Sequence, residues 1–175
     1  MLRICLRCIL LFFILSFSKA HAQQGTVSSQ QLKAVFLLNF TRFIEWPSYS
    51  FRSVDEPFTI GIVNDNSLYF YLSELVASDK VNGHPIAIRL YKNTHEIKNC
   101  HLLFFGNVGN LREGLVAVKG KATLTVGDAS EFCTVGGMIR FFTDANKMRF
   151  EINNEAAKES GLRISSRLLT LASVK

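Results

Sequence analysis

Short apolar runs of strand length alternate with helical patterns through the middle of this chain, and this alternation constrains its fold more than any other feature. The runs FTIGIV, HPIAIRLY, HLLFFG and ATLTVGD predict strands over 58–63, 84–91, 101–106 and 122–128. The spacing of apolar side chains predicts helices over 65–78 and 108–118, with a shorter helical piece over 94–99. Strands that alternate with helices form parallel sheets covered on both faces. The sequence therefore predicts an α/β fold.

The C-terminal third has a different pattern. The segments Met138–Phe142 and Lys147–Ile152 flank the turn sequence TDAN and predict an antiparallel hairpin appended to the sheet. The sequence NNEAAKESG predicts a short helix with Asn153 or Asn154 as its N-cap and Gly161 as its left-handed end. A last helix is predicted in SSRLLTLA, capped by Ser165 or Ser166.

The stretch KAVFLLNFTRFIEW predicts a helix over 30–45 that is apolar on nearly every face. Its broad stripe includes Phe40, so it needs cover on two sides, from the sheet and from the C-terminal helix or a second chain. Asn39 falls inside this stripe, where its amide either holds the helix in register or contacts a ligand or partner. Trp46 before Pro47 ends the helix and forms either a core plug or a binding platform.

Residues 1–22 have the pattern of a secretory signal peptide, because Arg3 and Arg7 precede an apolar run and small residues surround Ala22. We expect cleavage near Ala22, a single domain over 23–175 and a location in the periplasm. A retained membrane anchor is the alternative, although the run is shorter than the ~20 residues that span a bilayer. Cleavage would leave 17 basic against 14 acidic side chains, so the formal charge of +6 would fall to +3. Without clustering, that charge disfavours nucleic-acid binding.

Cys100 and Cys133 are the cysteines that remain after the predicted cleavage. In an oxidising compartment they could form a disulfide, which would stabilise the fold by about 3–4 kcal/mol in the chain-entropy model. Two buried thiols are the alternative, and both interpretations stay open because sequence does not place the two Cα atoms. His84, His95 and His101 lack the short paired spacings of metal ligands, so no metal site is predicted.

Motifs with a known catalytic mechanism are missing from the sequence. A phosphate-binding loop would need Gly-x-x-x-x-Gly-Lys followed by Ser or Thr, and the nearest segment, 114–121, has one residue too many. Neither Gly-x-Gly-x-x-Gly after a strand nor the Gly-x-Ser-x-Gly of hydrolases occurs. We therefore predict no enzymatic activity, no catalytic residues and no cofactor.

Five segments together resemble the YfiR/HmsC family: AVFLLNFTRFIEWP, CHLLFFG, LTVGDASEFCTVGGMIRFF, MRFEIN and AAKESGLRISSRLLTLA. The likeness spans nearly the whole predicted mature chain and includes the pair Gly136 and Gly137. It implies a Rossmann-like α/β fold without catalysis. It further implies a periplasmic repressor that binds the periplasmic sensor domain of an inner-membrane diguanylate cyclase, so that cyclic di-GMP and biofilm formation fall. Cys100 and Cys133 stand where single members of two separate family disulfides would be.

The resemblance suggests, by analogy, a second partner: an outer-membrane, peptidoglycan-binding lipoprotein that sequesters the repressor. The many phenylalanines also make self-association as a homodimer plausible. A different hypothesis is a small-molecule-binding module with its pocket at the carboxyl ends of the parallel strands.

For the repressor hypothesis, we expect the partner surface on the hairpin and the last helices. There Arg140, Glu151 and Arg163 would offer charge beside the apolar Phe141 and Leu162. Glu151 could also form a salt bridge with Arg163 across the connection between the hairpin and the last helices.

Overall fold

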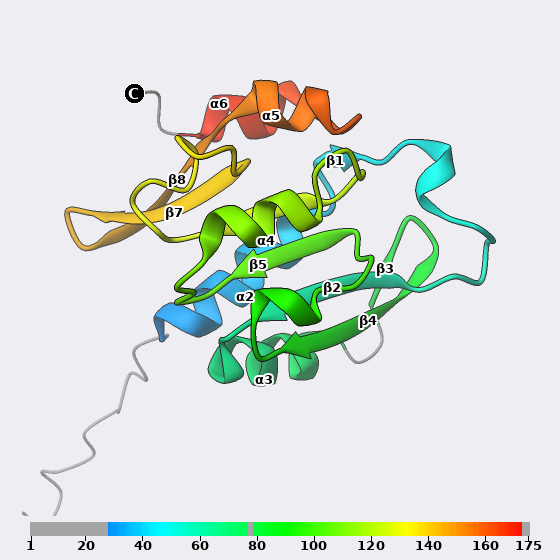
Figure 1. Cartoon of the computed structure of the whole chain (residues 1–175), viewed down its shortest axis with the longest axis horizontal. Coiled ribbons are helices and arrows are strands. Elements are labelled where there is room, and N and C mark those ends of the chain that lie inside the picture. Colours follow the sequence, from blue (N-terminus) through cyan, green and yellow to red (C-terminus); the bar gives the residue numbers. More distant parts are fainter. Residues whose placement is uncertain (1–27, 77–78, 173–175) are drawn as a thin grey trace, which may run out of the picture.

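Seven strands form one sheet in the order β3-β4-β2-β5-β6-β7-β8 (Figure 1). The computed structural model describes residues 28–76 and 79–172, so the predicted signal peptide and its cleavage site lie outside the described residues. The strands are β2 (Phe58–Val63), β3 (Lys80–Val81), β4 (His84–Tyr91), β5 (Leu102–Phe105), β6 (Leu124–Gly127), β7 (Ile139–Asp144) and β8 (Lys147–Ile152). The strands from β4 to β7 in this order run parallel, whereas β3 and β8 pair antiparallel at the edges. The predicted α/β fold with its antiparallel hairpin is confirmed.

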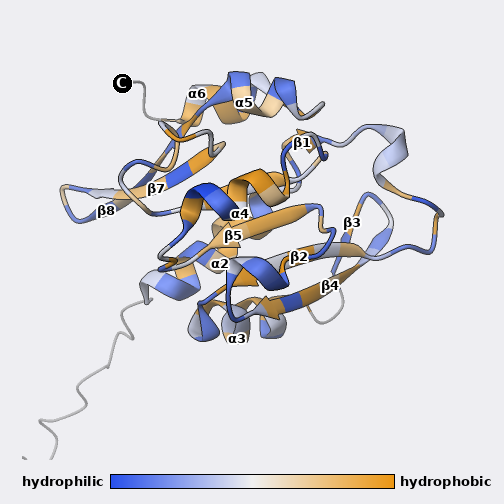
Figure 2. Cartoon of the chain, viewed as in Figure 1, coloured by the Kyte–Doolittle hydropathy of each residue, from blue (hydrophilic) through white to orange (hydrophobic). Residues whose placement is uncertain are grey.

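Helices cover both faces of this sheet, as predicted. α2 (Ser29–Phe40) and α3 (Asn66–Leu75) pack side by side on one face, and α4 (Leu111–Ala117) lies on the other (Figure 1). Neighbouring residues of one strand therefore enter different cores: Ile62 of β2 belongs to the larger core with α2 and α3, and Val63 to the smaller core with α4. The central strands β2 and β5 are hydrophobic along their length (Figure 2), as expected for strands buried on both faces.

The chain beyond the hairpin forms α5 (Asn154–Glu159), β9 (Arg163–Ile164) and α6 (Ser166–Leu171). The predicted caps are present: the Asn153 side chain accepts a hydrogen bond from the Ala156 N–H, and the Ser165 hydroxyl accepts one from the Leu168 N–H. Gly161 ends α5 at a φ of +76°, a left-handed value that glycine adopts without strain. The predicted helical piece over 94–99 is a 3-10 turn over Thr94–Glu96.

The end of the helix predicted over 30–45 is wrong. α2 starts with a capping box between Ser28 and Gln31 and ends at Phe40, where the Thr41 hydroxyl donates a hydrogen bond to the Leu38 carbonyl. Ile44–Glu45 then form the strand β1, which pairs antiparallel with β9. The apolar pattern continues past Phe40 because β1 is also partly buried. Periodicity within one segment cannot reveal a strand partner that lies more than a hundred residues later.

Aromatic side chains hold α2 against the hairpin. The Phe40 ring stacks on Phe141 with centroids 5.6 Å apart and meets Phe150 edge-on at 5.1 Å. Phe36 packs against the same two rings at 5.8 and 5.9 Å. The helix is therefore covered on two sides, as predicted, but its neighbour beside the sheet is α3, where we had expected the C-terminal helix or a second chain.

Phe132 lies in a slot between two glycines on the connection from β6 to β7. Its ring is fully buried in the smaller core. A Cβ at Gly127 would come within 2.5 Å of the ring, and a Cβ at Gly137 would overlap the opposite edge of the same ring. The neighbouring Gly136 has a φ of +104°, so this turn needs glycine for conformation as well as for space.

We predict that Gly137→Ala lowers the free energy of unfolding by about 2 kcal/mol or more, because the added methyl overpacks against the buried Phe132 ring. The matched control is Gly109→Ala, whose new methyl would meet no atom within 4 Å and should change stability by less than about 0.5 kcal/mol. Urea unfolding of both variants measures the difference. Equal stabilities for the two variants would contradict the proposed packing of Phe132.

Candidate functional site

The carboxyl ends of β2 and β5 are where an open parallel sheet usually binds a ligand, because the strand order reverses between them. Here the two ends are closed against each other. Gly106 donates a backbone hydrogen bond to the Val63 carbonyl at 2.9 Å, and even a Cβ at Gly106 would lie only 2.7 Å from that oxygen. The Asn64 amide donates to the Asn107 carbonyl across the same gap. The segments that follow β2 and β5 are therefore hydrogen-bonded to each other, and the backbone leaves no room for a side chain at Gly106.

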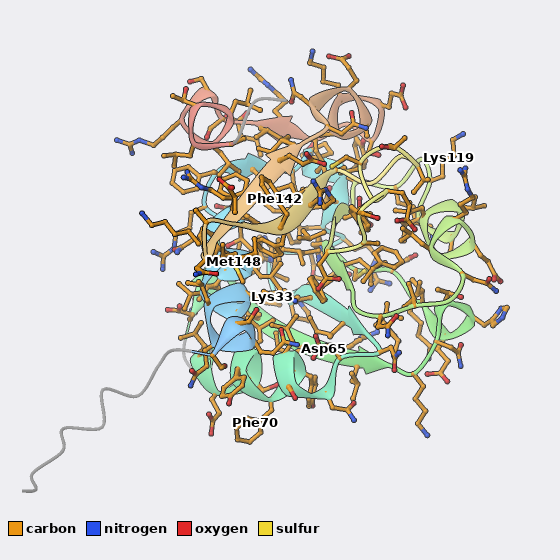
Figure 3. The ribbon with its side chains drawn as sticks, turned by 90° about the vertical axis from the view of Figure 1, so that its left-hand side faces the viewer. Lys33, Asp65, Phe70, Lys119, Phe142 and Met148 are labelled. Atoms are coloured by element: carbon orange, nitrogen blue, oxygen red, sulfur yellow. The ribbon has the colours of Figure 1, made fainter. Side chains whose placement is uncertain are left out.

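Two side chains from the first turns of α2 contact acidic residues at this edge. The Lys33 ammonium lies 2.6 Å from an Asp128 carboxylate oxygen, after β6, and 5.6 Å from the centre of the Phe104 ring. The Gln30 amide donates at 2.7 Å to Asp65, the N-cap of α3. Figure 3 labels Lys33 and Asp65 at this edge. Neither contact is predictable from the sequence, because a lone lysine in an apolar helix gives no signal of its partner.

Arg140 and Glu151 form a largely buried ion pair across the hairpin. They are direct partners in the β7–β8 register, with Arg140 Nε 2.6 Å from Glu151 Oε1 and side-chain exposures of 11% and 12%. The Arg140 guanidinium also lies 4.9 Å from the Phe142 ring centre, and Glu151 raises the pKa of this arginine mainly through the hydrogen bond. The pair stabilises the hairpin from within.

The predicted salt bridge between Glu151 and Arg163 is wrong. Arg163 lies on β9, opposite Glu45 of β1, and its Nε is 3.6 Å from the Glu45 carboxylate. These two side chains are 84% and 73% exposed. Strand pairing decides both partnerships, since Glu151 faces Arg140 on β7 and Arg163 faces Glu45 on β1.

The remaining predicted binding residues lie in different environments. Phe141 and Leu162 are buried in the larger core, at 2% and 1% exposure, so they present no surface to a partner in this conformation. Asn39 is half-buried on α2, and within the described residues its side-chain amide makes no hydrogen bond that would hold the helix in register. The structure thus brings Arg140, Glu151 and Phe141 together on the hairpin and separates them from Arg163 and Asn39.

A family model described as YfiR/HmsC-like matches residues 30–173. The chain belongs to this family. No curated protein matches it. Proteins of the YfiR/HmsC-like family are generally non-catalytic regulators. Among the described residues of this family member, no helix is long and apolar enough to cross a membrane, and no group of three or more His, Cys, Asp or Glu side chains is placed to hold a metal ion.

Cys100 and Cys133, the cysteines among the described residues of this YfiR/HmsC-like protein, are free thiols. Cys100 is buried beside Gly61, and burial raises its pKa to about 12. Cys133 is half-buried behind β7, and burial, followed by the nearby Glu151 carboxylate, raises its pKa to about 11. Both side chains therefore stay protonated near neutral pH and are weak nucleophiles. Of the two alternatives left open by the sequence, the structure contains the unpaired thiols.

His101 lies at the amino end of β5 in a stack of rings. Its Nδ1 accepts a hydrogen bond from the Thr59 N–H at 3.0 Å, which places the proton on Nε2, where it donates to the Ser50 carbonyl at 3.1 Å. Phe51 and Phe58 stack on the imidazole at 4.4 and 4.9 Å, and His84 stacks on Phe51 at 3.9 Å. Burial lowers the pKa of His101, although the hydrogen bond to Ser50 partly opposes that shift.

Trp46 and Pro47 join the β1–β9 ribbon to this stack. The Trp46 indole N–H donates to the His101 carbonyl at 3.2 Å, and its ring meets Phe58 edge-on at 4.9 Å. Pro47 caps the 3-10 turn over Ser48–Ser50 that leads to Phe51. The half-buried Trp46 therefore packs against the core, as the plug interpretation expects, and does not form an open platform.

We predict that Glu151→Gln lowers the free energy of unfolding by about 2–3 kcal/mol, because the largely buried Arg140 guanidinium loses its counter-charge. The matched variant Glu45→Gln removes the exposed carboxylate opposite Arg163 and should cost less than about 1 kcal/mol. Urea unfolding measures the free energy of unfolding of both variants. The two values can be compared directly when the unfolding curves have equal slopes. A Glu151→Gln variant that is no less stable than Glu45→Gln would show that the buried pair contributes no more to the free energy of unfolding than the exposed pair.

A second prediction concerns pH. The pKa of folded His101 lies below its ordinary value of 6.5, so the unfolded chain binds more protons than the folded chain as the pH falls through that value. Stability should therefore fall between pH 7 and pH 5, at a rate of up to about 1.4 kcal/mol per pH unit from this one group.

The His101→Gln variant isolates this contribution, because its amide cannot titrate. We expect the variant to be less stable at pH 7 but to lose less stability than the native protein between pH 7 and pH 5, as measured by urea unfolding. Staying above pH 5 keeps the carboxyl groups largely ionised. The same loss in both proteins over this range would rule out His101 as the source.

Proposed function

We propose that this protein is a non-catalytic periplasmic regulator that binds the periplasmic sensor domain of an inner-membrane diguanylate cyclase and represses it, lowering cyclic di-GMP and biofilm formation. The observation that carries the proposal is the family match over residues 30–173, which includes almost every described residue. The proposal includes export to the periplasm with removal of the signal peptide near Ala22.

The closed carboxyl edge of the sheet supports a docking function over a small-molecule module of the usual α/β kind. In that fold the ligand binds outside the ends of β2 and β5. Here Gly106, Lys33 and Gln30 fill this region with contacts inside the protein. A regulator that acts through its surface does not need that crevice.

The surface that we propose for docking is the β1–β9 ribbon with its exposed Arg163–Glu45 pair. The ribbon lies beside α5 and α6 at one end of the molecule (Figure 1). An exposed ion pair contributes little to folding, because solvent screens it and its long side chains lose entropy on pairing. Both charges are therefore available to form new pairs with a partner at little cost in stability. Asn39 is a further candidate contact, since it is partly exposed and makes no side-chain hydrogen bond within the described residues.

The predicted residues that are buried have supporting roles in this proposal. Leu162 precedes Arg163 and anchors the ribbon in the core. Arg140, Phe141 and Glu151 hold the hairpin and its contact with α2. The proposal includes two other partners for the exposed surfaces. One is a second copy of this chain, and the other is an outer-membrane lipoprotein that sequesters the regulator.

Repression has a simple energetic requirement. The regulator must bind the inactive state of the cyclase more tightly than the active state, and a tenfold shift between them needs about 1.4 kcal/mol of differential affinity. One or two charge pairs that form with only one state can supply that difference.

The test is Arg163→Glu. We expect this variant to fold normally, to bind the purified periplasmic domain of the cyclase at least about tenfold more weakly and to fail to lower cyclic di-GMP in a deletion strain. Calorimetry and a cyclic di-GMP assay measure the two effects.

The matched control is Arg149→Glu, which also removes an exposed arginine beside a carboxylate, with Arg149 Nε 4.0 Å from Asp144, but near the hairpin tip. It should bind and repress like the native protein. Normal repression by Arg163→Glu would exclude the ribbon as the docking surface. A deletion strain with unchanged cyclic di-GMP would overturn the proposed function itself.

A further inference from the structure

An open cavity of about 620 Å³ lies at the amino edge of the sheet, opposite to the closed carboxyl edge. Its walls come from the loop before β2, from β4 and from the connections that lead into β5 and β6. The cavity is therefore a feature of the fold and not of one side chain.

Cations from three separate segments line this cavity. They are Arg89 on β4, Lys98 before β5 and Lys121 before β6. Within the described residues none of the three has an acidic side chain within 4 Å. A hollow that gathers several unpaired positive charges raises the local concentration of anions.

The acid in the lining does not neutralise these cations. Glu56 accepts hydrogen bonds from the Arg52 backbone N–H at 2.6 Å and from the Arg52 guanidinium at 2.9 and 3.1 Å. Its charge is therefore already matched by Arg52, which also lines the cavity. The lining keeps three formal positive charges from Arg89, Lys98 and Lys121.

Neutral groups complete the cavity. Cys100 and His101 lie in its wall, where the thiol is protonated and both imidazole nitrogens are hydrogen-bonded. The Tyr49 ring, 71% exposed, stands at the rim and provides a flat apolar surface. Arg89 and Lys98 also line a second hollow of about 770 Å³ beside the first, so they are reachable from both sides.

We propose that this cavity binds a small organic anion with two or more negative charges, of the class of a phosphate monoester or a di- or tricarboxylate. Lys98, Lys121 and Arg89 hold the charged groups, and Tyr49 packs against the carbon skeleton. The site does not depend on the proposed repression of a cyclase, since it uses neither Arg163 nor the hairpin.

Calorimetric titration with three probes at constant ionic strength tests this inference: inorganic phosphate, phenyl phosphate and citrate. We expect saturable binding of at least one probe, with phenol as the uncharged comparison giving none. Tighter binding of phenyl phosphate would identify a phosphate ester as the preferred class, and tighter binding of citrate a polycarboxylate.

The variants Lys98→Gln and Lys121→Gln should each weaken binding of the best probe about tenfold, because a charge-assisted contact is worth about 1.5–3 kcal/mol. Lys119→Gln is the matched control. Lys119, labelled in Figure 3, is also exposed and follows the same helix, and it is not among the residues that line the cavity. It should bind the probe like the native protein.

Two results would overturn the proposal. One is no saturable heat with any of the three anions. The other is an equal loss of affinity in Lys119→Gln and Lys121→Gln, which would indicate attraction by overall charge and not a built cavity. Thermal unfolding without the probe confirms that these exposed substitutions leave the fold intact. Binding of the cyclase domain by Lys121→Gln distinguishes failure of this site from failure of the proposed function.

Discussion

The packing of α2 on the sheet and hairpin is the interaction on which the rest of this structure depends. Phe36 and Phe40 join the helix to Phe141 and Phe150 on the two arms of the hairpin. At the other end of the helix, Gln30 and Lys33 bind carboxylates that follow β2 and β6. Apolar contacts supply most of the stabilisation, and the polar contacts determine where along the sheet the helix sits.

This arrangement moves the available surfaces away from the usual ligand site of an α/β sheet. An anion at the carboxyl edge would have to displace Lys33 from Asp128 and would still find Gly106 closed against Val63. At the amino edge, by contrast, three cations face an open cavity without acidic partners among the described residues. The fold therefore separates two tasks: the carboxyl edge holds the helix, and the amino edge and the β1–β9 ribbon remain open to other molecules.

Features that depend on local pattern were predictable from the sequence. The strands Phe58–Val63 and His84–Tyr91 have the predicted bounds, because each is a continuous apolar or alternating run between turn residues. The stop at Gly161 follows from residue type and position, and each N-cap was narrowed to two neighbouring residues, of which the structure uses Asn153 and Ser165. The family resemblance could likewise be recognised from the sequence, since it rests on order and spacing.

Features that depend on pairing between distant segments were not predictable. The apolar pattern predicts a helix that continues to residue 45, because nothing near Ile44 indicates that its backbone pairs with Ile164. Glu151 was paired with Arg163 for the same reason: the strand register that places it opposite Arg140 is set by the whole hairpin. The cations of the amino-edge cavity come from three segments. A single basic residue in the sequence does not indicate which distant residues lie beside it in the fold.

One segment physically connects the proposed docking ribbon to the cavity. After β1, Trp46 donates to the His101 carbonyl, and Ser50 accepts from the His101 ring. Tyr49, between them, lines the cavity and packs close to Gly161, which ends α5 just before β9. A ligand that contacts Tyr49 therefore acts on the chain that leaves β1 and on the chain that enters β9, which lie at the same end of the ribbon. Because linkage is reciprocal, an anion that strengthens docking must bind the complex more tightly than the free chain by the same factor.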